Sequence, residues 1–447
     1  MPLKTQPSPS TFPGPIGKSF IDEIQKYVLA DPFPFTLDLA AGSGMWLQTV
    51  DGQRLFDWAG YYASKLIGHN HPGLYEPDYV KRLTVAANNK VANPDFLTPE
   101  CVAYYREIYN SAPVCMRSED LEVYCVNSGA EAVENMMKYF INLDLQKRLG
   151  SGKDKGRSKF IYFDQAFHGR TVFALSVTQL DHDPVITRDY HTFDHGNIQI
   201  PFPAIDNDKS VEENRSRCAE SLRIVETILK LQSDEVVAII LEPLQGAGGH
   251  RVALTEFYQG LSRLAHEHNV YFGFDEVQTV GGQTGKFFAC DIFDLPYPPQ
   301  AVAGAKKLGC GVVYMLYPME DHGVLDSTWG GTLADMVRFV HEMTIVREER
   351  LLEQVDEKAS HLIGTLKRLQ SKYLDKMFNV RGLGLYQGFS LASAEMKSAF
   401  QKHARDVEGL LLLGAGPDTI RLRPNLNVTI EDIDLLRDML DRCFNAV

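Results

Sequence analysis

The sequence lacks any long apolar run. Nowhere in its 447 residues is there a stretch of the roughly 18 to 20 apolar residues that a membrane-spanning helix needs. The first 17 residues also lack the apolar centre of a secretory signal. With 44% hydrophobic and 23% charged residues, we expect a globular, cytoplasmic protein, and the length suggests two or three domains.

Cysteine is scarce, and so are runs of basic residues. The seven cysteines include no CxxC pair, and an odd number spread so widely argues against both a disulfide framework and a zinc site. We therefore expect reduced thiols and no bound metal. The formal net charge of −13, without a long basic run, disfavours nucleic acid as a partner and favours solubility.

Short β-rich runs alternate with segments of helical period between about residues 120 and 310. This alternation is typical of βαβ units around a mainly parallel sheet, and therefore of an α/β fold. The predicted strands are Leu121–Val126, Lys159–Phe163, Phe173–Thr178, Val236–Leu241 and Val270–Phe274. The predicted helices are Ala130–Leu143, Glu213–Leu231 and Glu256–His268.

The two ends of the chain differ from this central region. The Pro- and Ser-rich first 17 residues predict an arm over a neighbouring surface or a disordered tail. After Gly331, charged amphipathic helices, short strands and a terminal helix begun by the capping sequence Thr429–Asp432 predict a smaller α+β domain. We expect residues 1–60 to form the arm and part of the small domain, 61–332 the large domain, and 333–447 the C-terminal small domain.

Polar residues directly follow three of the predicted strands. The turn Asn127–Ala130 follows the first, Glu242 follows another, and Asp275 follows the last. Because the carboxyl ends of strands in an open parallel sheet form the ligand crevice, these residues can converge on one site. Backbone N–H groups at Asn127–Ala130 suit a phosphate, although Ser and Gly also serve there as simple caps. Because Asp275 ends an apolar strand, its buried carboxylate needs a cation or hydrogen-bond donors as partners. A protonated pyridine nitrogen, an arginine or the N-terminus of a helix could be that partner.

Two further segments carry side chains that could take part in catalysis or ligand binding. Lys306 and Lys307 follow a run of small apolar residues, where lost hydration lowers the pKa of a lysine and favours the nucleophilic amine. The alternative is that both lysines lie on the surface and are solvated. In Phe167–Arg170, the Phe could stack on a flat ring and the Arg could bind a carboxylate through two hydrogen bonds. Alternatively, the Phe is an ordinary core residue and the Arg an ordinary surface residue.

Together these segments resemble the class III (omega) pyridoxal-phosphate-dependent aminotransferases of fold type I. The resemblance runs from Asp51–Gly52 to IRLRP at 420–424, and FDEVQT at 274–279 is its most specific piece. NSGAE, FHGR, LEPLQG, FDEVQT, a lysine and STWGG occur in the same order as in the family. The resemblance implies pyridoxal 5′-phosphate as cofactor, and a large domain with a mainly parallel seven-stranded sheet beside a smaller α+β domain.

The resemblance also implies how the cofactor is held. Lys306 would form the Schiff base, Asp275 would keep the pyridine nitrogen protonated, and Gln278 would bond the phenolic oxygen. Ser327 and Thr328 would reach the phosphate of the other subunit, which implies a homodimer with shared active sites. The full set implied to bind the cofactor is Ser128, Gly129, Ala130, Phe167, His168, Asp275, Gln278, Lys306, Ser327 and Thr328.

Lys306, Asp275 and Glu242 would be the catalytic residues. We expect Arg421 to bind the α-carboxylate of 2-oxoglutarate or glutamate, and Glu242 to neutralise it when a terminal amine occupies the site. Arg170 would bind the distal carboxylate of the substrate in both half-reactions. The residues expected to bind substrate are Tyr62, Arg170, Glu242 and Arg421.

Within the class, FHGRT, the double lysine, STWGG and DTIRLRPNL are most similar to the L-lysine 6-aminotransferases. This implies transfer of the terminal amino group of L-lysine to 2-oxoglutarate, giving glutamate and 2-aminoadipate 6-semialdehyde, which cyclises to piperideine-6-carboxylate. Aminotransferases for 4-aminobutyrate or ornithine are alternatives, and a non-catalytic regulatory or scaffolding protein is an alternative of another class. Three departures from the family pattern, Ala247, Val280 and Thr332, weaken the substrate assignment more than the reaction.

Overall fold

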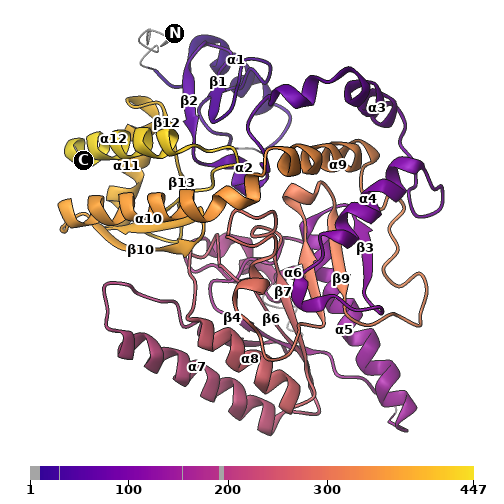
Figure 1. Ribbon diagram of the computed structural model, residues 1–447. Helices are drawn as coiled ribbons and strands as arrows, with labels where there is room; N and C mark the ends of the chain where they lie inside the picture. The colour runs from indigo at the N-terminus through magenta and orange to yellow at the C-terminus, as the bar shows by residue number, and fades with distance from the viewer. Residues whose placement is uncertain (1–10, 30, 154, 191–195) are drawn as a thin grey trace.

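A seven-stranded sheet forms the centre of the molecule. The computed structural model describes residues 11–29, 31–153, 155–190 and 196–447 (Figure 1). The strand order is β3-β9-β8-β7-β6-β4-β5, and only β9 runs antiparallel to its neighbours. The predicted α/β fold with a mainly parallel seven-stranded sheet is confirmed. The strands are β3 (Glu122–Val126), β4 (Lys159–Phe163), β5 (Ile198–Ile200), β6 (Val236–Leu241), β7 (Tyr271–Asp275), β8 (Ala301–Gly304) and β9 (Gly311–Met315).

Helices cover both faces of this sheet. Every residue of β6, β8 and β9 is buried, which is why these strands read as continuous apolar runs. On one face, α5 (Gly129–Gly150) packs across β8 and β9. On the other, α8 (Thr255–Glu267) packs on β6 and β7, with α7 (Val211–Leu231) beside it (Figure 1).

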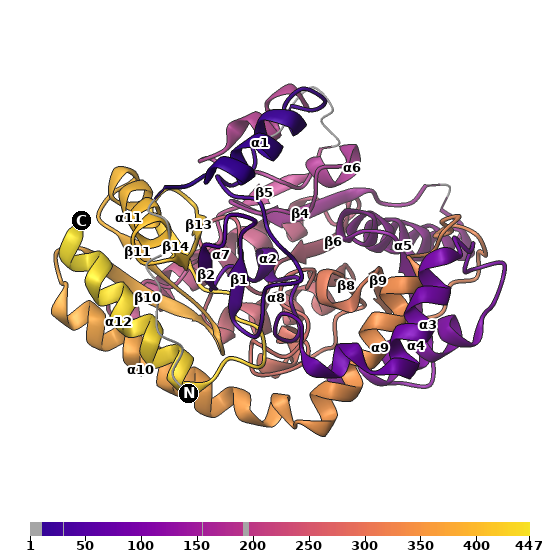
Figure 2. The ribbon, with the colours of Figure 1, turned by 90° about the horizontal axis from the view of Figure 1, so that it is seen from above.

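A second group of helices lies at one end of the sheet. There α9 (Leu333–Glu348) packs against α3 (Pro77–Asn88) and α4 (Pro99–Asn110), as both ribbon views show (Figures 1 and 2). The remaining short helices of the described chain are α1 (Pro15–Ile24), α2 (Gly60–Ala63), α6 (Val172–Leu175), η1 (Pro72–Tyr75), η2 (Val114–Met116), η3 (Pro184–Ile186), η4 (Arg188–Tyr190), η5 (Ala289–Ile292), η6 (Lys306–Leu308) and η7 (Leu351–Gln354).

Two smaller sheets join the ends of the chain. One has the order β10-β11-β14-β13 and the other β1-β2-β12, in which β12 pairs in parallel with β2. A segment near the N-terminus therefore shares a sheet with a segment near the C-terminus. These elements are β1 (Trp46–Gln48), β2 (Arg54–Asp57), β10 (Met377–Leu383), β11 (Tyr386–Leu391), β12 (Leu410–Leu411), β13 (Leu413–Ala415), β14 (Thr419–Arg421), α10 (Val355–Lys372), α11 (Ala394–Asp406) and α12 (Ile430–Ala446).

Four of the five predicted strands form within a residue or so of their predicted bounds, and the three predicted central helices are present. The predicted strand Phe173–Thr178 is wrong, because this segment forms the short helix α6 and the turn after it. Both edges of β4 are already paired, with β5 and β6, so no edge is free for it there. Instead, the backbone N–H groups of Phe173 and Ala174 donate to Glu134 of α5, at 3.0 and 3.1 Å.

The predicted N-terminal arm lies partly outside the described residues, which begin at Thr11. From there the segment contacts its own chain. Gln53 Nε2 donates to the Thr11 carbonyl at 2.7 Å, and the N–H groups of Ile16 and Gly17 donate to the Asp51 carboxylate, both at 2.8 Å. None of the described helices combines the length and apolarity needed to cross a bilayer.

Candidate active site

A cavity of about 290 Å³ lies at the carboxyl ends of the central strands. It is formed by the start of α5, the segment after β4, and the residues that follow β6, β7 and β8. Strand order alone brings these segments together, because parallel strands end at the same edge of the sheet. The predicted site residues that line the cavity are Gly129, Ala130, Phe167, His168, Arg170, Glu242, Asp275, Gln278 and Lys306.

One end of the cavity is the N-terminus of α5. Ser128 is the N-cap, and its hydroxyl accepts the N–H of Glu131 at 3.2 Å. The N–H groups of Gly129 and Ala130 are among the first four of the helix, which have no intrahelical acceptor and can hold an anion. A Cβ at Gly129 would lie 2.7 Å from Val277 Cγ1, so a side chain there would push into the cavity wall.

A histidine that also lines the cavity holds Asp275 in place. His168 Nδ1 lies 2.8 Å from Asp275 Oδ2, and Asp275 Oδ1 accepts the N–H of Val277 at 3.0 Å. Burial alone would lower the pKa of His168, but the hydrogen bond and charge of Asp275 raise it. His168 and the N–H of Val277 therefore hold the Asp275 carboxylate in one orientation within the cavity.

The structure distinguishes the two adjacent lysines. Lys306 lines the cavity, whereas Lys307 turns into the protein. Lys307 Nζ donates to the carbonyls of Ala63 and Gln278, at 3.0 and 2.8 Å, and to the hydroxyl of Tyr386 at 2.9 Å. Its amine is thus fully engaged away from the cavity.

The environment of Lys306 favours the neutral amine. Burial lowers its pKa, and the charge of Arg421 acts in the same direction, while Asp275 and Glu242 oppose both. The backbone of Lys306 has a φ of +51°, a conformation that L-residues rarely adopt. An amine with a lowered pKa, in the same cavity as a carboxylate, is suited to nucleophilic attack on a carbonyl.

The sequence interpretation missed a group of residues behind Gln278. Arg423 donates from Nε and Nη2 to Gln278 Oε1, at 3.2 and 3.0 Å, and its Nη2 lies 2.9 Å from His250 Nδ1. Its guanidinium also lies 4.5 Å from the centre of the Tyr386 ring. Because a guanidinium only donates hydrogen bonds, Gln278 must turn its oxygen to Arg423 and is left with its NH₂ group for the cavity. In the sequence, the second arginine of the IRLRP motif could have indicated this group.

The expected ion pair between Glu242 and Arg421 is not formed among the described residues. Glu242 instead accepts the N–H groups of Phe167 and Gly246, at 2.9 and 3.3 Å. Burial raises the pKa of Glu242 to about 7. The neutralising role of Glu242 therefore stays a prediction.

Of the other predicted substrate-binding residues, Arg170 lines the cavity, whereas Arg421 and Tyr62 do not. Arg421 is buried, its Nε has no hydrogen-bond partner in the part of the chain that the structure describes, and burial lowers its pKa to about 10. Its guanidinium lies 5.9 Å from the centre of the half-exposed Tyr62 ring. Arg170 is exposed, with its guanidinium 6.0 Å from the Phe167 ring centre.

The last two predicted site residues lie outside the cavity of their own chain. Ser327 Oγ accepts a hydrogen bond from Asn127 Nδ2 at 2.6 Å, and Thr328 is exposed to solvent. Neither residue lines the cavity. Their predicted contact with the phosphate of another subunit stays a prediction.

The donor set fits pyridoxal 5′-phosphate. Free N–H groups at a helix start suit the phosphate, and the Asp275 carboxylate suits a protonated pyridine nitrogen. The Gln278 amide offers a donor for the phenolic oxygen, and the Lys306 amine can reach an aldehyde within the same cavity.

The family model described as Aminotransferase class-III matches residues 29–444 of this chain. The chain belongs to the class III aminotransferases. Members of this class use pyridoxal 5′-phosphate and have fold type I, as the motifs predicted. The predicted family membership is confirmed.

Relatives named for different amine donors are similar to this chain at nearly the same identity. An L-lysine-epsilon aminotransferase of Amycolatopsis lactamdurans is 30% identical over 94% of each chain. A probable mitochondrial 4-aminobutyrate aminotransferase of Caenorhabditis elegans is 29% identical over 99% of this chain and 94% of its own. The structure of a lysine aminotransferase from M. tuberculosis has a TM-score of 0.90 at 27% identity, covering 96% of this chain and 99% of its own.

Proposed function

We propose that this class III aminotransferase uses pyridoxal 5′-phosphate to transfer the terminal amino group of L-lysine to 2-oxoglutarate. The observation that carries the reaction is that Asp275 and Lys306 line the same cavity at the carboxyl end of the sheet. The choice of L-lysine is supported by the lysine aminotransferases among its relatives. The products would be glutamate and 2-aminoadipate 6-semialdehyde.

Each residue of the cavity has a separate task in this proposal. The bound cofactor supplies an electron sink for the substrate carbon that bears the amine. Lys306 would take the proton from that carbon and pass it to carbon C4′ of the cofactor, a transfer for which a lowered pKa suits its amine. Asp275, held by His168, keeps the ring nitrogen protonated. The N–H groups of Gly129 and Ala130 hold the phosphate.

Two arginines of different burial would bind the substrates. Arg421 is buried, its Nε has no hydrogen-bond partner among the described residues, and it would bind the α-carboxylate of 2-oxoglutarate. Arg170 lies on the exposed side of the cavity and would bind the distal carboxylate. Leaving a buried guanidinium without an anion is unfavourable, which favours an acceptor with a carboxylate beside its carbonyl carbon, and Arg170 would favour a second carboxylate.

A panel of amine donors tests the proposal. The protein, loaded with pyridoxal phosphate, would receive 2-oxoglutarate with L-lysine, L-ornithine or 4-aminobutyrate, and glutamate would be measured. We expect the largest kcat/KM with L-lysine. A larger value with 4-aminobutyrate or ornithine would keep the reaction and replace the substrate. No glutamate from any donor would support the non-catalytic alternative.

The attachment point of the cofactor is tested separately. Borohydride reduction of the loaded protein, followed by peptide mapping, should place the label on Lys306. Lys307 is the internal control, because its amine donates to three oxygen acceptors inside the protein. A label on Lys307 would contradict the assignment.

Single-turnover kinetics test the role of Glu242. We expect Glu242→Ala to slow the half-reaction of the terminal amine more than that of glutamate, since only the first leaves Arg421 without a carboxylate. Each half-reaction can be followed by the cofactor's visible absorbance. Equal slowing of both half-reactions would remove the neutralising role.

A further inference from the structure

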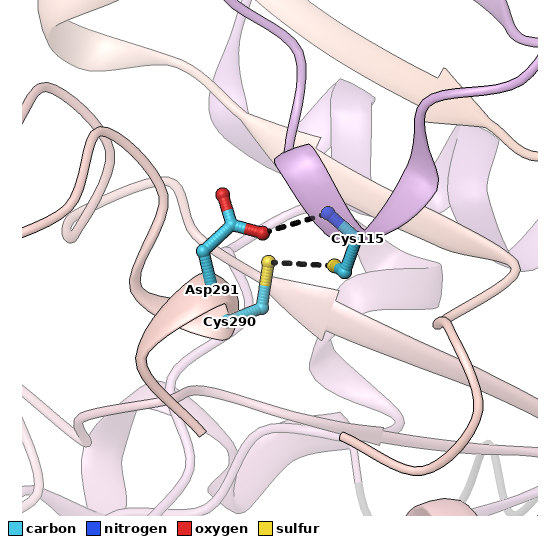
Figure 3. A group of neighbouring side chains, drawn as sticks. All are labelled: Cys115, Cys290 and Asp291. Atoms are coloured by element: carbon cyan, nitrogen blue, oxygen red, sulfur yellow. Dashed lines mark hydrogen bonds between the residues drawn. The ribbon is translucent and has the colours of Figure 1, made fainter. Parts of the chain in front are cut away.

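Two cysteines that the transamination site does not use meet on another part of the molecule. Cys115 lies in η2 and Cys290 in η5, and their Sγ atoms are 4.0 Å apart although 175 positions separate them in the chain. Figure 3 shows the two sulfurs facing each other, with Asp291 beside them. The contact is therefore a product of the fold.

Asp291 holds the two short helices at this distance. One carboxylate oxygen accepts the N–H of Val114 at 2.9 Å. The other accepts the N–H of Cys115, also at 2.9 Å (Figure 3). Both bonds join the backbone of η2 to Asp291 of η5, and so they keep the two cysteines next to each other.

The two thiols differ in their access to solvent. Cys115 is partly exposed, whereas the other six cysteines of the chain are buried. Cys290 is 0% exposed and lies behind Cys115. A dissolved oxidant can therefore reach Cys115 first, and the nearest reducing group to the oxidised sulfur is the Cys290 thiol.

The same three residues could also be considered as metal ligands, since their ligand atoms lie within 4.8 Å of one another. Two features argue against a metal. Both oxygens of Asp291 already accept backbone N–H groups. The cluster also supplies three ligands where a structural zinc site takes four.

We propose that Cys115 and Cys290 form a peroxide oxidation site that closes into an intramolecular disulfide. Hydrogen peroxide first oxidises the Cys115 thiol to a sulfenic acid, and its second oxygen leaves as water. The Cys290 sulfur then attacks the Cys115 sulfur, so that the S–S bond forms, the S–O bond breaks and a second water leaves with the thiol proton. The sulfurs must close from 4.0 Å to about 2.05 Å, a movement within reach of side-chain rotation.

The disulfide would tie η2 to the segment that follows the cofactor-binding strand. The N–H groups of Ala289 and Cys290 donate to the Glu276 carboxylate, at 2.8 and 2.7 Å, and Glu276 is the neighbour of Asp275. Formation of the disulfide also protects Cys115 from irreversible oxidation, because a sulfenic acid that is not resolved proceeds to a sulfinic acid.

Peroxide treatment of the full-length, cofactor-loaded protein tests this site. We expect the loss of two of the seven free thiols and a non-reduced peptide that joins Cys115 to Cys290, both reversed by dithiothreitol. In Cys290→Ser, we expect Cys115 to accumulate as a sulfenic acid that dimedone traps. In Cys115→Ser, Cys290 should stay reduced at the same peroxide dose.

Cys443→Ser is the matched control, since it removes a buried cysteine far from the pair in sequence. It should leave the yield of the disulfide unchanged. Unaltered melting temperature and visible absorbance in the three variants would show that they fold and bind cofactor. Three results would overturn the proposal: both thiols stay reduced, Cys115 links to a second chain on a non-reducing gel, or added zinc is retained and shields both thiols.

Discussion

At the scale of single residues, Arg423 decides what Gln278 offers to the cavity. The guanidinium occupies the amide oxygen with two hydrogen bonds and is itself held by His250 and Tyr386. Burial lowers the pKa of His250 well below its usual value, so its imidazole stays neutral and can accept from Arg423. The amide NH₂ is then the only end of Gln278 free to meet a phenolic oxygen.

Replacing Arg423 by Met should therefore weaken cofactor binding through Gln278. We expect the dissociation constant for pyridoxal phosphate to rise about 10-fold, the value of one hydrogen bond to a charged oxygen. The double variant Arg423→Met with Gln278→Ala should bind no more weakly than Gln278→Ala alone. Titration with pyridoxal phosphate, followed by its visible absorbance, measures the dissociation constants of the two single variants and the double variant. Additive losses of affinity would show that Arg423 does not act through Gln278.

A second residue, Glu276, makes stability depend on pH. It is fully buried, and burial raises its pKa from 4.5 to about 7 although Thr279, Ala289 and Cys290 donate to it. Between these values the folded protein retains a proton that the unfolded chain releases. This contribution is complete below pH 4.5 and is lost as the pH rises to 7.

We expect Glu276→Gln to flatten the pH dependence of the unfolding free energy. Glu276 accounts for a decrease of about 3 kcal/mol between pH 4.5 and 7, which the neutral amide cannot contribute. Urea unfolding of both proteins at pH 5, 6 and 7 measures the difference. Parallel curves for the two proteins would show that Glu276 does not retain the proton.

At the scale of elements, the ends of the helices follow local rules. The N-terminus of α12 is a capping box in which the Thr429 hydroxyl accepts the N–H of Asp432 at 3.1 Å. Asp432 in return accepts the N–H of Thr429 at 2.9 Å. The capping sequence predicted this helix start because both bonds connect residues three positions apart.

Thr429→Ala removes the cap without touching the cavity. We expect the free energy of unfolding to fall by about 1 kcal/mol, with transamination unchanged. Thr429→Ser, which retains the hydroxyl, should behave as the wild type in the same denaturation experiment. An equal loss in both variants would point to the methyl group instead of the cap.

The element predicted as a strand at Phe173–Thr178 shows where local patterns fail. Its apolar and β-branched residues satisfy the strand rules, yet the segment forms α6. Short apolar runs are ambiguous between strand and helix, and here the contact with Glu134 of α5 and the paired edges of β4 decide. Neither is visible in the segment itself.

At the scale of the whole molecule, the pairing of β12 with β2 supports the proposed division into domains. Residues 1–60 and 333–447 would form the smaller domain, and 61–332 the larger. Within this division, α9 belongs to the C-terminal part while it packs on α3 and α4 of the larger domain.

Ser327 and Thr328 make a prediction for the assembly. If they complete the site of a partner, mixing Lys306→Ala chains with Ser327→Ala/Thr328→Val chains should restore activity that neither variant has alone. Each hybrid dimer would contain one intact site, so about a quarter of wild-type activity is expected from random mixing. Co-expression with two affinity tags and a glutamate assay measures it. No recovery would place all the residues of a site on one chain.

By itself, the sequence determined the reaction class and most of the cavity lining. The motifs that carry Asn127–Ala130, Glu242 and Asp275 each follow a strand, and a parallel sheet must bring the ends of its strands together. Helix starts and buried strands were also predictable, because caps and apolar runs are local.

Only the tertiary structure decided which groups face each other across the chain. It placed Lys306 in the cavity and Lys307 in a network of oxygen acceptors, although the two are neighbours. It also brought Arg423 to Gln278 and Cys115 to Cys290. These contacts depend on packing between distant segments, which leaves no periodicity or spacing in the sequence from which they could be predicted.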